Sequence, residues 1–287
     1  MSDDHSPTGA AGTGATPTTG PPAPPHRRPG GGDDHGNGPS SGLRTRLDAF
    51  DDLPDAVALR RRSYQLLGLG AGDSVVDAGC GAGRAVGEIA AIIAGRGGSV
   101  VGIDLDEDMI ATARLRCPEA DFHVGDANAL SLDDSSVTAY RADKVLHALT
   151  DPAAALAEAH RVLRPGGRIV LVGQEWDGCL VDAESRDLTL RITRAWADAL
   201  PSPGSARAFP RLLRQVGFSR VEVEARCALF TGRAFLPPLI GAARAAVDSG
   251  AVAPADAQAW LEDQQRRMGS GNFLAAAPFI LASARKP

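Results

Sequence analysis

The sequence predicts an α/β fold in which strands of a mostly parallel sheet alternate with helices. A β-branched run, Val75-Val76, ends at Asp77, and three glycines at alternate positions and an Ala/Ile-rich segment follow it. This is the pattern of a strand, a tight turn and a helix. A second β-branched run ends at Asp104, 27 positions after Asp77. Three more apolar runs follow with helical segments between them, an alternation typical of βαβ units.

The first 42 residues differ in composition from the rest of the chain. They contain no Val, Leu, Ile, Phe, Tyr or Trp, and 18 of the 42 are Gly or Pro. Such a segment cannot bury enough apolar surface to offset its ordering entropy, so we expect residues 1–42 to be a disordered tail. It also lacks the apolar core of a secretory signal. The remaining residues, 43–287, suit one large domain.

The charge balance argues against a nucleic-acid partner. The formal net charge is −5, and lysine occurs only at Lys144 and Lys286, against 28 arginines. Nucleic-acid binding requires a basic face that neutralises phosphates, which this composition does not indicate. The longest uncharged runs are shorter than the ~20 apolar residues that cross a bilayer, so we expect no membrane span. The Ala, Gly, Arg and Pro bias is typical of a GC-rich bacterial genome.

The cysteines indicate neither a metal site nor a disulfide framework. They are scattered and show no C-x-x-C spacing. We therefore expect no bound metal and reduced thiols in a cytoplasmic protein. The four are Cys80, Cys117, Cys179 and Cys227.

The segment Leu43–Leu67 is predicted to be helical, with an interruption at Pro54. A basic cluster, Arg60–Arg62, lies just before Tyr64. One interpretation is a solvated helix face. In the other, this helix crosses over a ligand of the glycine turn, and one arginine or Tyr64 meets a carboxylate of that ligand.

Acidic residues and proline mark the starts of later helices, and glycines mark the ends. Gly95–Gly98 ends the helix that begins at Arg84. Asp106–Asp108 open the next helix, where acidic side chains suit the positive helix terminus. Pro152 starts a helix that ends at Arg164–Gly167.

These signals divide the chain into strands and helices. Strands are predicted at Asp73–Asp77, Ser99–Asp104, Asp121–Leu130 including its exit, Val137–Asp143, Arg168–Val172, Val221–Thr231 and Asn272–Ser283. Helices are predicted at Arg84–Ala94, from Asp106 onward, and at Ala153–Leu163, Asp182–Leu200, Phe209–Val216, Arg233–Asp248 and Pro254–Met268.

Two carboxylates follow neighbouring strands. Asp104 ends the second strand, where a carboxylate can accept both hydrogen bonds that a ribose diol donates. Asp126 follows the third strand, where it either binds a ligand or caps a turn. Leu105 and Met109 lie beside Asp104 and either flank a nucleobase or belong to the core.

Motifs from five places in the chain occur in one order. They are Asp77-x-Gly79-x-Gly81-x-Gly83, Asp104, Asp126, Val145-Leu146-His147 and Leu163-Arg164-Pro165-Gly166-Gly167. Over residues 60–173 this order resembles the class I S-adenosylmethionine (SAM) dependent methyltransferases. The resemblance is greatest to small-molecule enzymes of the ubiquinone/menaquinone type and their natural-product relatives. Ala148 departs from the pattern, because many relatives have a second polar residue at this position.

The resemblance implies a Rossmann-like seven-stranded sheet of order 3-2-1-4-5-7-6, in which the last strand is antiparallel. It also implies helical cap elements on the domain. We expect residues 43–67 to form an N-terminal lid and residues 233–268 a helical cap insertion over the acceptor.

The same resemblance implies SAM as cofactor and S-adenosylhomocysteine (SAH) as product. Asp104 would bind the ribose, and Asp126 with a neighbouring backbone N–H would bind the adenine amine. The residues expected to bind the cofactor are Asp77, Ala78, Gly79, Cys80, Gly81, Gly83, Asp104, Leu105, Met109, Gly125, Asp126, Ala127 and Arg141.

Candidates for catalysis and acceptor binding lie after the fourth and fifth strands. His147 and Glu175 are the catalytic candidates, joined by Asp177, and a base is needed only if the acceptor must lose a proton. Tyr64, His147, Glu175 and Trp176 are the substrate candidates. The alternatives are a packing role for His147 and a solvated loop for Glu175 and Asp177.

The sequence therefore predicts methyl transfer from SAM to O, N or C of a small molecule in bacterial natural-product metabolism. One alternative is a SAM-binding cyclase or scaffold that does not methylate. An RNA or protein methyltransferase is less favoured because no basic face or recognition domain is visible, and a nicotinamide-dependent oxidoreductase is disfavoured by the spacing of the turn. A homodimer is left open.

Overall fold

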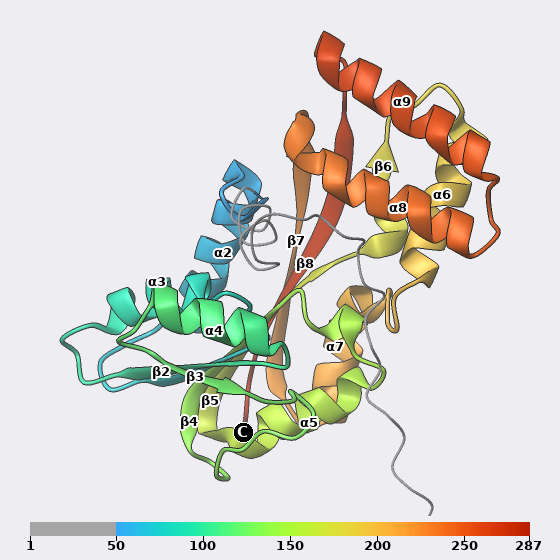
Figure 1. The fold of residues 1–287 in the computed structure, drawn as a ribbon. Helices are drawn as coiled ribbons and strands as arrows, with labels where there is room; N and C mark the ends of the chain where they lie inside the picture. Colours follow the sequence, from blue (N-terminus) through green and yellow to red (C-terminus); the bar gives the residue numbers. More distant parts are fainter. Residues whose placement is uncertain (1–49) are drawn as a thin grey trace, which may run out of the picture. The chain divides into compact units, whose positions relative to one another are not determined.

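The computed structural model describes residues 50–287. The tail predicted for residues 1–42 and the first part of the predicted lid, residues 43–49, lie outside this range. The described strands form one mixed sheet (Figure 1). They are β1 Ser74–Ala78, β2 Ser99–Asp104, β3 Asp121–Val124, β4 Val137–Asp143, β5 Leu163–Gln174, β6 Leu180–Val181, β7 Ser219–Phe230 and β8 Ala275–Arg285.

The topology of the sheet is the one that the sequence predicts. The order is β3-β2-β1-β4-β5-β8-β6, and β7 also pairs with β8. Strands β1 to β5 run parallel, whereas β8 is antiparallel to both β5 and β7. When the two-residue strand β6 is set aside, β7 and β8 are the sixth and seventh strands. The predicted order 3-2-1-4-5-7-6, with an antiparallel last strand, is confirmed.

The ends of β1, β7 and β8 lie one to three residues from their predicted positions, β3 ends at Val124 before the predicted exit, and two further strands differ by more. The short strand β6 is additional and pairs with the first two residues of β8. Strand β5 begins at Leu163 rather than Arg168. The reason is a tertiary contact: the N–H of Gly166 donates to the Lys286 carbonyl at 2.8 Å, and the N–H of Lys286 donates to the Gly167 carbonyl at 3.0 Å. The chain after β8 therefore holds this glycine segment in extended form.

The helices lie close to their predicted positions. They are α2 Pro54–Leu67, α3 Arg84–Ile93, α4 Glu107–Arg116, α5 Pro152–Val162, α6 Arg186–Asp198, α7 Ser205–Gln215, α8 Leu236–Asp248 and α9 Pro254–Ser270. Single 3₁₀ turns occur at η1 Leu146–Ala148, η2 Trp176–Gly178 and η3 Arg233–Phe235. The Asp106 carboxylate accepts from the N–H groups of Asp108 and Met109, as expected for the start of α4. Of the helices in residues 50–287, none combines the length and hydrophobicity needed to cross a membrane.

Three buried apolar clusters hold the described chain together. One, with Ile89, Ile110 and Phe122, packs α3 and α4 against the sheet. A second, which contains Phe209, packs α5 and α7 against it. A third, which contains Trp260, joins α6, α8 and α9 to the ends of β7 and β8 (Figure 1). Each cluster buries aliphatic and aromatic side chains whose removal from water stabilises the fold.

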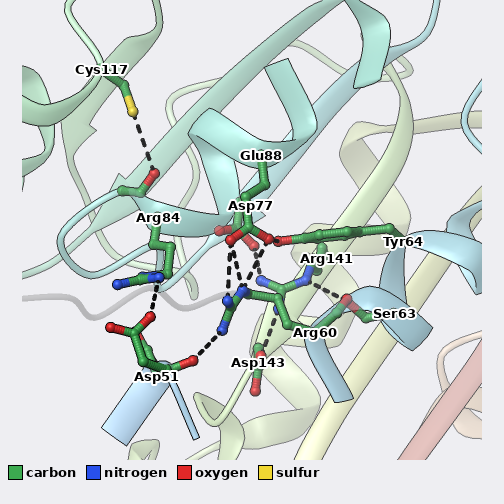
Figure 2. Close-up of polar contacts among 12 residues, drawn as sticks. Asp51, Arg60, Ser63, Tyr64, Asp77, Arg84, Glu88, Cys117, Arg141 and Asp143 are labelled. Carbon is green, nitrogen blue, oxygen red and sulfur yellow. Dashed lines mark hydrogen bonds and ion pairs between the residues drawn. The ribbon is translucent and has the colours of Figure 1, made fainter. Parts of the chain in front are cut away.

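A group of buried charges lies beneath the glycine turn. Arg141, in β4, is only 2% exposed. Its guanidinium donates from Nη1 to Asp77 Oδ1 at 2.7 Å, from Nη2 to Asp143 Oδ2 at 2.6 Å and from Nε to Ser63 Oγ at 2.9 Å. Burial opposes the charge of Arg141, but Asp77 and Asp143 outweigh it and raise its pKa. These four residues, the Arg141 cluster, join α2, β1 and β4 (Figure 2).

A second polar contact joins α2 to α3. Arg60 donates from Nε to Glu88 Oε2 at 3.0 Å, and the Tyr64 hydroxyl donates to the same oxygen at 3.0 Å (Figure 2). The Arg141 guanidinium lies 5.5 Å from the centre of the Tyr64 ring. The contact of Arg60 and Tyr64 with Glu88, the α2–α3 clamp, thus connects to the Arg141 cluster and fixes α2 against the start of the domain.

Replacing Arg141 with Ala should lower the free energy of unfolding by about 3–5 kcal/mol, because Asp77 and Asp143 would stay buried without a counter-charge. Urea unfolding measures the loss. The control is Arg244→Ala, which removes a half-exposed partner of Asp248 in α8 and should cost at most about 1 kcal/mol. Equal losses in the two variants would contradict the role of the cluster.

The α2–α3 clamp should weaken in acid. Burial raises the pKa of Glu88, but the hydrogen bond and charge of Arg60 outweigh it and hold the pKa below the ordinary value of 4.5. The stabilisation is therefore complete above about pH 4.5 and is lost as the pH falls through the lower folded value. Unfolding of the parent and Glu88→Gln from pH 6 to pH 3 should show a stability difference that shrinks below pH 4.5. A difference independent of pH would refute this account.

Candidate functional site

The three glycines of the turn after β1 differ in their surroundings. Gly79, Gly81 and Gly83 have φ of +70°, +54° and +80°, a region that suits glycine. A Cβ on Gly79 would lie 2.2 Å from Val145 Cγ2, and one on Gly83 would lie 2.8 Å from Ala113 Cβ. A Cβ on Gly81 would meet no described atom within 4 Å. Gly79 and Gly83 thus permit close packing, whereas Gly81 borders open space.

Asp104 holds the turn in place. The N–H groups of Gly79 and Cys80 donate to the Ile103 carbonyl at 2.7 and 3.0 Å. The N–H of Gly81 donates to Asp104 Oδ2 at 2.8 Å, and the N–H of Asp106 donates to Oδ1 at 3.0 Å. Each carboxylate oxygen has two lone pairs, so both can accept one more hydrogen bond. Asp104 therefore shapes the turn and still offers two acceptors to a diol.

Asp126 lies at the exit of the neighbouring strand. The N–H of Gly125 donates to the Asp104 carbonyl at 2.9 Å, which brings the ends of β2 and β3 together. Asp126 Oδ1 accepts from the backbone N–H of Asn128 at 2.8 Å and from its side-chain amide at 3.0 Å. Within residues 50–287 no donor is bonded to Oδ2. Asp126 thus caps a local turn with one oxygen and leaves the other for a ligand.

The other residues predicted to bind the cofactor near these carboxylates differ in how far they are buried. Leu105 is 71% exposed, so the core alternative does not apply to it. Met109 is half-buried in the first turn of α4, while Ala78 and Ala127 are buried. Cys80 is buried too, and this burial raises the pKa of its thiol well above the ordinary value. The thiol is therefore protonated at neutral pH, so Cys80 fits as a small residue of the turn.

An aromatic group follows β4 and β5. The His147 ring in η1 lies 5.0 Å from the Trp176 ring in η2, and Trp176 meets Trp196 of α6 edge-on at 4.9 Å. The N–H of Ser202 donates to the His147 carbonyl at 3.0 Å and ties the segment before α7 to η1. These three rings, the aromatic ladder, join the carboxyl ends of two central strands to the helices of the third cluster.

Glu175, at the end of β5, carries a buried carboxylate. Its only ion pair among the described residues is with Arg207 of α7, whose Nη2 lies 2.7 Å from Oε1. Within residues 50–287 no donor is bonded to the other carboxylate oxygen, Oε2. Arg207 also pairs with Asp177. Glu175, Arg207 and Asp177 form the Arg207 bridge.

The residues before α2 reach the same edge of the sheet. Asp52 Oδ1 lies 2.7 Å from Arg84 Nη1 at the start of α3, and Asp51 Oδ1 lies 3.7 Å from Lys144 Nζ just after β4. Lys144 Nζ also lies 5.5 Å from the centre of the Phe50 ring. Residues 50–52, the strap, therefore pair with both basic residues beside the glycine turn.

Lys144, Arg84, Arg207 and Trp196 are the residues at this edge that the sequence does not single out. Lys144 has a φ of +60°, a strained conformation for a residue with a side chain. Its position directly after β4, like that of Arg84 directly after Gly83, is a signal that could have identified it. Arg207 and Trp196 have no motif around them. Within residues 50–287 no group of three or more His, Cys, Asp or Glu side chains is arranged to hold a metal ion.

Comparison with known proteins identifies the family. Residues 76–171, from β1 to β5, match the family model described as "Methyltransferase domain". The chain is also 33% identical over 255 residues to an uncharacterized 37.1 kDa protein in transposon TN4556 of Streptomyces fradiae, with 85% of this chain and 72% of that relative covered. The chain belongs to the class I SAM-dependent methyltransferases.

Further similarities of this methyltransferase concern the central motifs and the fold. It is 35% identical over 112 residues to demethylmenaquinone methyltransferase of Beutenbergia cavernae, which covers 39% of this chain and 45% of that relative. It thus spans less than half of that enzyme. Geranyl diphosphate C-methyltransferase of Streptomyces coelicolor A3(2), solved with SAH, has a TM-score of 0.53 and 19% identity, covering 89% and 86% of the two chains. At that identity the likeness concerns the fold.

The residues of this methyltransferase fit SAM, the cofactor of the family. The open side of Gly81 leaves room for a ligand against the backbone. Asp104 would accept from the two ribose hydroxyls, and Asp126 Oδ2 would accept from the adenine amine, and both roles stay predictions. These donors and acceptors lie at the carboxyl ends of parallel strands, where ligands of open α/β sheets bind.

Two predicted ligand residues lie beneath the turn in the structure. Arg141 gives its donors to Asp77, Asp143 and Ser63, so its contact with the cofactor stays a prediction. Tyr64 is 8% exposed and donates to Glu88, so its contact with a substrate likewise stays a prediction. The Arg141–Ser63 and Tyr64–Glu88 hydrogen bonds hold α2 in place.

Gly81→Ala should separate cofactor binding from folding. The positive φ costs about 1–2 kcal/mol of stability, and the added Cβ points into the open space, so the affinity for SAM should fall at least about tenfold. Gly79→Ala should be far less stable because of its clash with Val145. Titration calorimetry with SAM and urea unfolding give the two readouts.

The control for this pair is Gly241→Ala in α8, where an added Cβ would touch no described atom. It should leave the affinity for SAM unchanged and keep or slightly raise stability. SAM binding of Gly81→Ala at the parent's affinity would show that Gly81 does not face the cofactor.

Proposed function

We propose that this methyltransferase transfers the methyl group of SAM to O, N or C of a small-molecule acceptor in bacterial natural-product metabolism. The observation that carries the proposal is the Asp104 carboxylate, which is fixed by the N–H groups of Gly81 and Asp106 beside the open side of the glycine turn. An acceptor pair held at this position suits a nucleoside diol.

The residues of the chain would mainly bind and orient. Asp104 accepts from the ribose, Asp126 Oδ2 accepts from the adenine amine, and the turn lies along the amino-acid tail. When bound, SAM supplies an electrophilic methyl group on a sulfonium. Alignment of the acceptor with that methyl group lowers the barrier by up to about 7–11 kcal/mol in well-oriented systems. A base is required only where the acceptor must lose a proton, and Glu175 and His147 are the candidates.

The acceptor would lie against the aromatic ladder. Trp176 follows β5 and His147 follows β4, the strand next to β1, and Trp196 connects them to α6. Helices α8 and α9, within the predicted cap of residues 233–268, pack with α6 in the third apolar cluster. This packing supports a cap over the acceptor, and the strap and α2 support a lid on the cofactor side. Cytoplasmic location and a homodimer stay predictions.

Asp104→Ala tests the proposal. Loss of hydrogen bonds to a charged acceptor, together with loosening of the turn, should weaken SAM binding by about 10- to 100-fold. The control is Asp108→Ala, an exposed residue in the first turn of α4. Titration calorimetry with SAM gives the affinity, and release of SAH with candidate acceptors gives turnover.

Two outcomes would contradict the proposal. One is unchanged SAM affinity in Asp104→Ala, and the other is a parent protein that does not bind SAM. A parent that binds SAM but releases no SAH with any acceptor would favour the alternative of a cyclase or scaffold.

A further inference from the structure

We infer that the acceptor is a basic amine, bound as its ammonium in the place that Arg207 takes beside Glu175. This inference rests on the proposed methyl transfer and narrows its acceptor to nitrogen. It starts from the charges around the aromatic ladder.

The Glu175 carboxylate has a single cationic partner among the described residues. Its side chain is 14% exposed, and both carboxylate oxygens are buried. Among residues 50–287, Arg207 is the one ion-pair partner of this carboxylate, with Nη2 2.7 Å from Oε1, and Oε2 accepts no hydrogen bond. A buried carboxylate in this condition is costly and is stabilised by a ligand that brings donors and positive charge.

Arg207 can leave Glu175 without becoming unpaired. Its side chain is 53% exposed, and it already pairs with Asp177. Asp177 in turn lies 3.9 Å from Arg194 of α6. A ligand cation at Glu175 would therefore leave Arg207 on Asp177 and in water. The two carboxylates of the Arg207 bridge can thus be shared between the arginine and a ligand.

The neighbouring side chain favours a cation over a neutral donor. Trp176 directly follows Glu175, and the aromatic ladder places its ring between His147 and Trp196. An ammonium at Glu175 would gain an ion pair with the carboxylate and, where it faces the indole, a cation–π contact. A hydroxyl gains only the hydrogen bond, and a ligand carboxylate is repelled by Glu175.

The basic side chains near the site do not favour an anionic acceptor. Lys144 pairs with Asp51, Arg84 pairs with Asp52, and Arg207 pairs with two carboxylates. In the part of the chain that the structure describes, each of these cations is thus already matched. An anionic acceptor would therefore have to compete with carboxylates that already hold these cations.

The chemistry balances with Glu175 as the proton acceptor. An ammonium has no lone pair, so it first transfers a proton to the Glu175 carboxylate. The freed lone pair then forms the N–C bond to the methyl group of SAM, while the S–C bond breaks and its electron pair stays on sulfur. The positive charge moves from sulfur to the methylated nitrogen, SAH is released, and the proton on Glu175 passes to water.

Three probes on one skeleton test the inference: 2-phenylethylamine, 2-phenylethanol and 3-phenylpropionate. Calorimetry on the full chain with SAH present should show that the amine binds at least tenfold more tightly than the alcohol and that the carboxylate binds most weakly. With SAM, the amine should give the greatest release of SAH. The amine preference should disappear in Glu175→Gln.

Arg207→Gln removes the competing cation and should strengthen amine binding several-fold without changing the affinity for SAM. The control is Arg211→Gln, one turn further along α7, where the guanidinium contacts only Gln215 among the described side chains. It should bind all three probes like the parent.

The amine assignment is overturned if the alcohol or the carboxylate binds as tightly as the amine, if no probe binds, or if Glu175→Gln keeps the preference. The proposed function is contradicted by a different result, namely that the parent protein does not bind SAM. Calorimetry with SAM alone therefore distinguishes the two failures.

Discussion

The ion pair between Arg141 and Asp77 is the constraint on which the site depends. The two residues are register partners on β4 and β1, so the sheet itself places their side chains next to each other. Arg141 also bonds to Asp143 and to Ser63 of α2, and all of this occurs almost without water. Because a buried charge without its partner is strongly unfavourable, α2, β1 and β4 keep one relative arrangement. The glycine turn starts from this fixed strand end.

At the carboxyl ends of the strands, single residues both stabilise the local backbone and offer acceptors to a ligand. Asp104 positions the Gly81 N–H and also faces the space in which a nucleoside fits. Asp126 closes a local turn with one oxygen and offers the other. Such double use explains why the alternatives of capping and ligand binding for these residues are not exclusive. A carboxylate has enough lone pairs for both.

Much of the fold is predictable from local patterns, because β-branched runs, glycines and acidic helix starts act over a few residues. The bounds of β2 and β4 are identical to the prediction. The start of β5 is not, since it depends on bonds between Gly166 and Lys286, 120 positions apart. The site shows the same limit. Asp104 follows from its strand, whereas the pairing of Arg207 with Glu175 depends on how α7 packs, and no local pattern shows whether Arg141 points to a ligand or to Asp77.

The strap has a consequence for how the cofactor side responds to its surroundings. Its contacts with Arg84 and Lys144 are ion pairs near the surface, and the Asp52 side chain is 62% exposed. Dissolved salt weakens such surface pairs and largely screens exposed charges that lie farther apart than about 8 Å at physiological ionic strength. The strength of the ion pairs between residues 50–52 and Arg84 and Lys144 thus varies with the ionic strength of the medium. The buried pair of Arg141 with Asp77 is screened much less by the same ions.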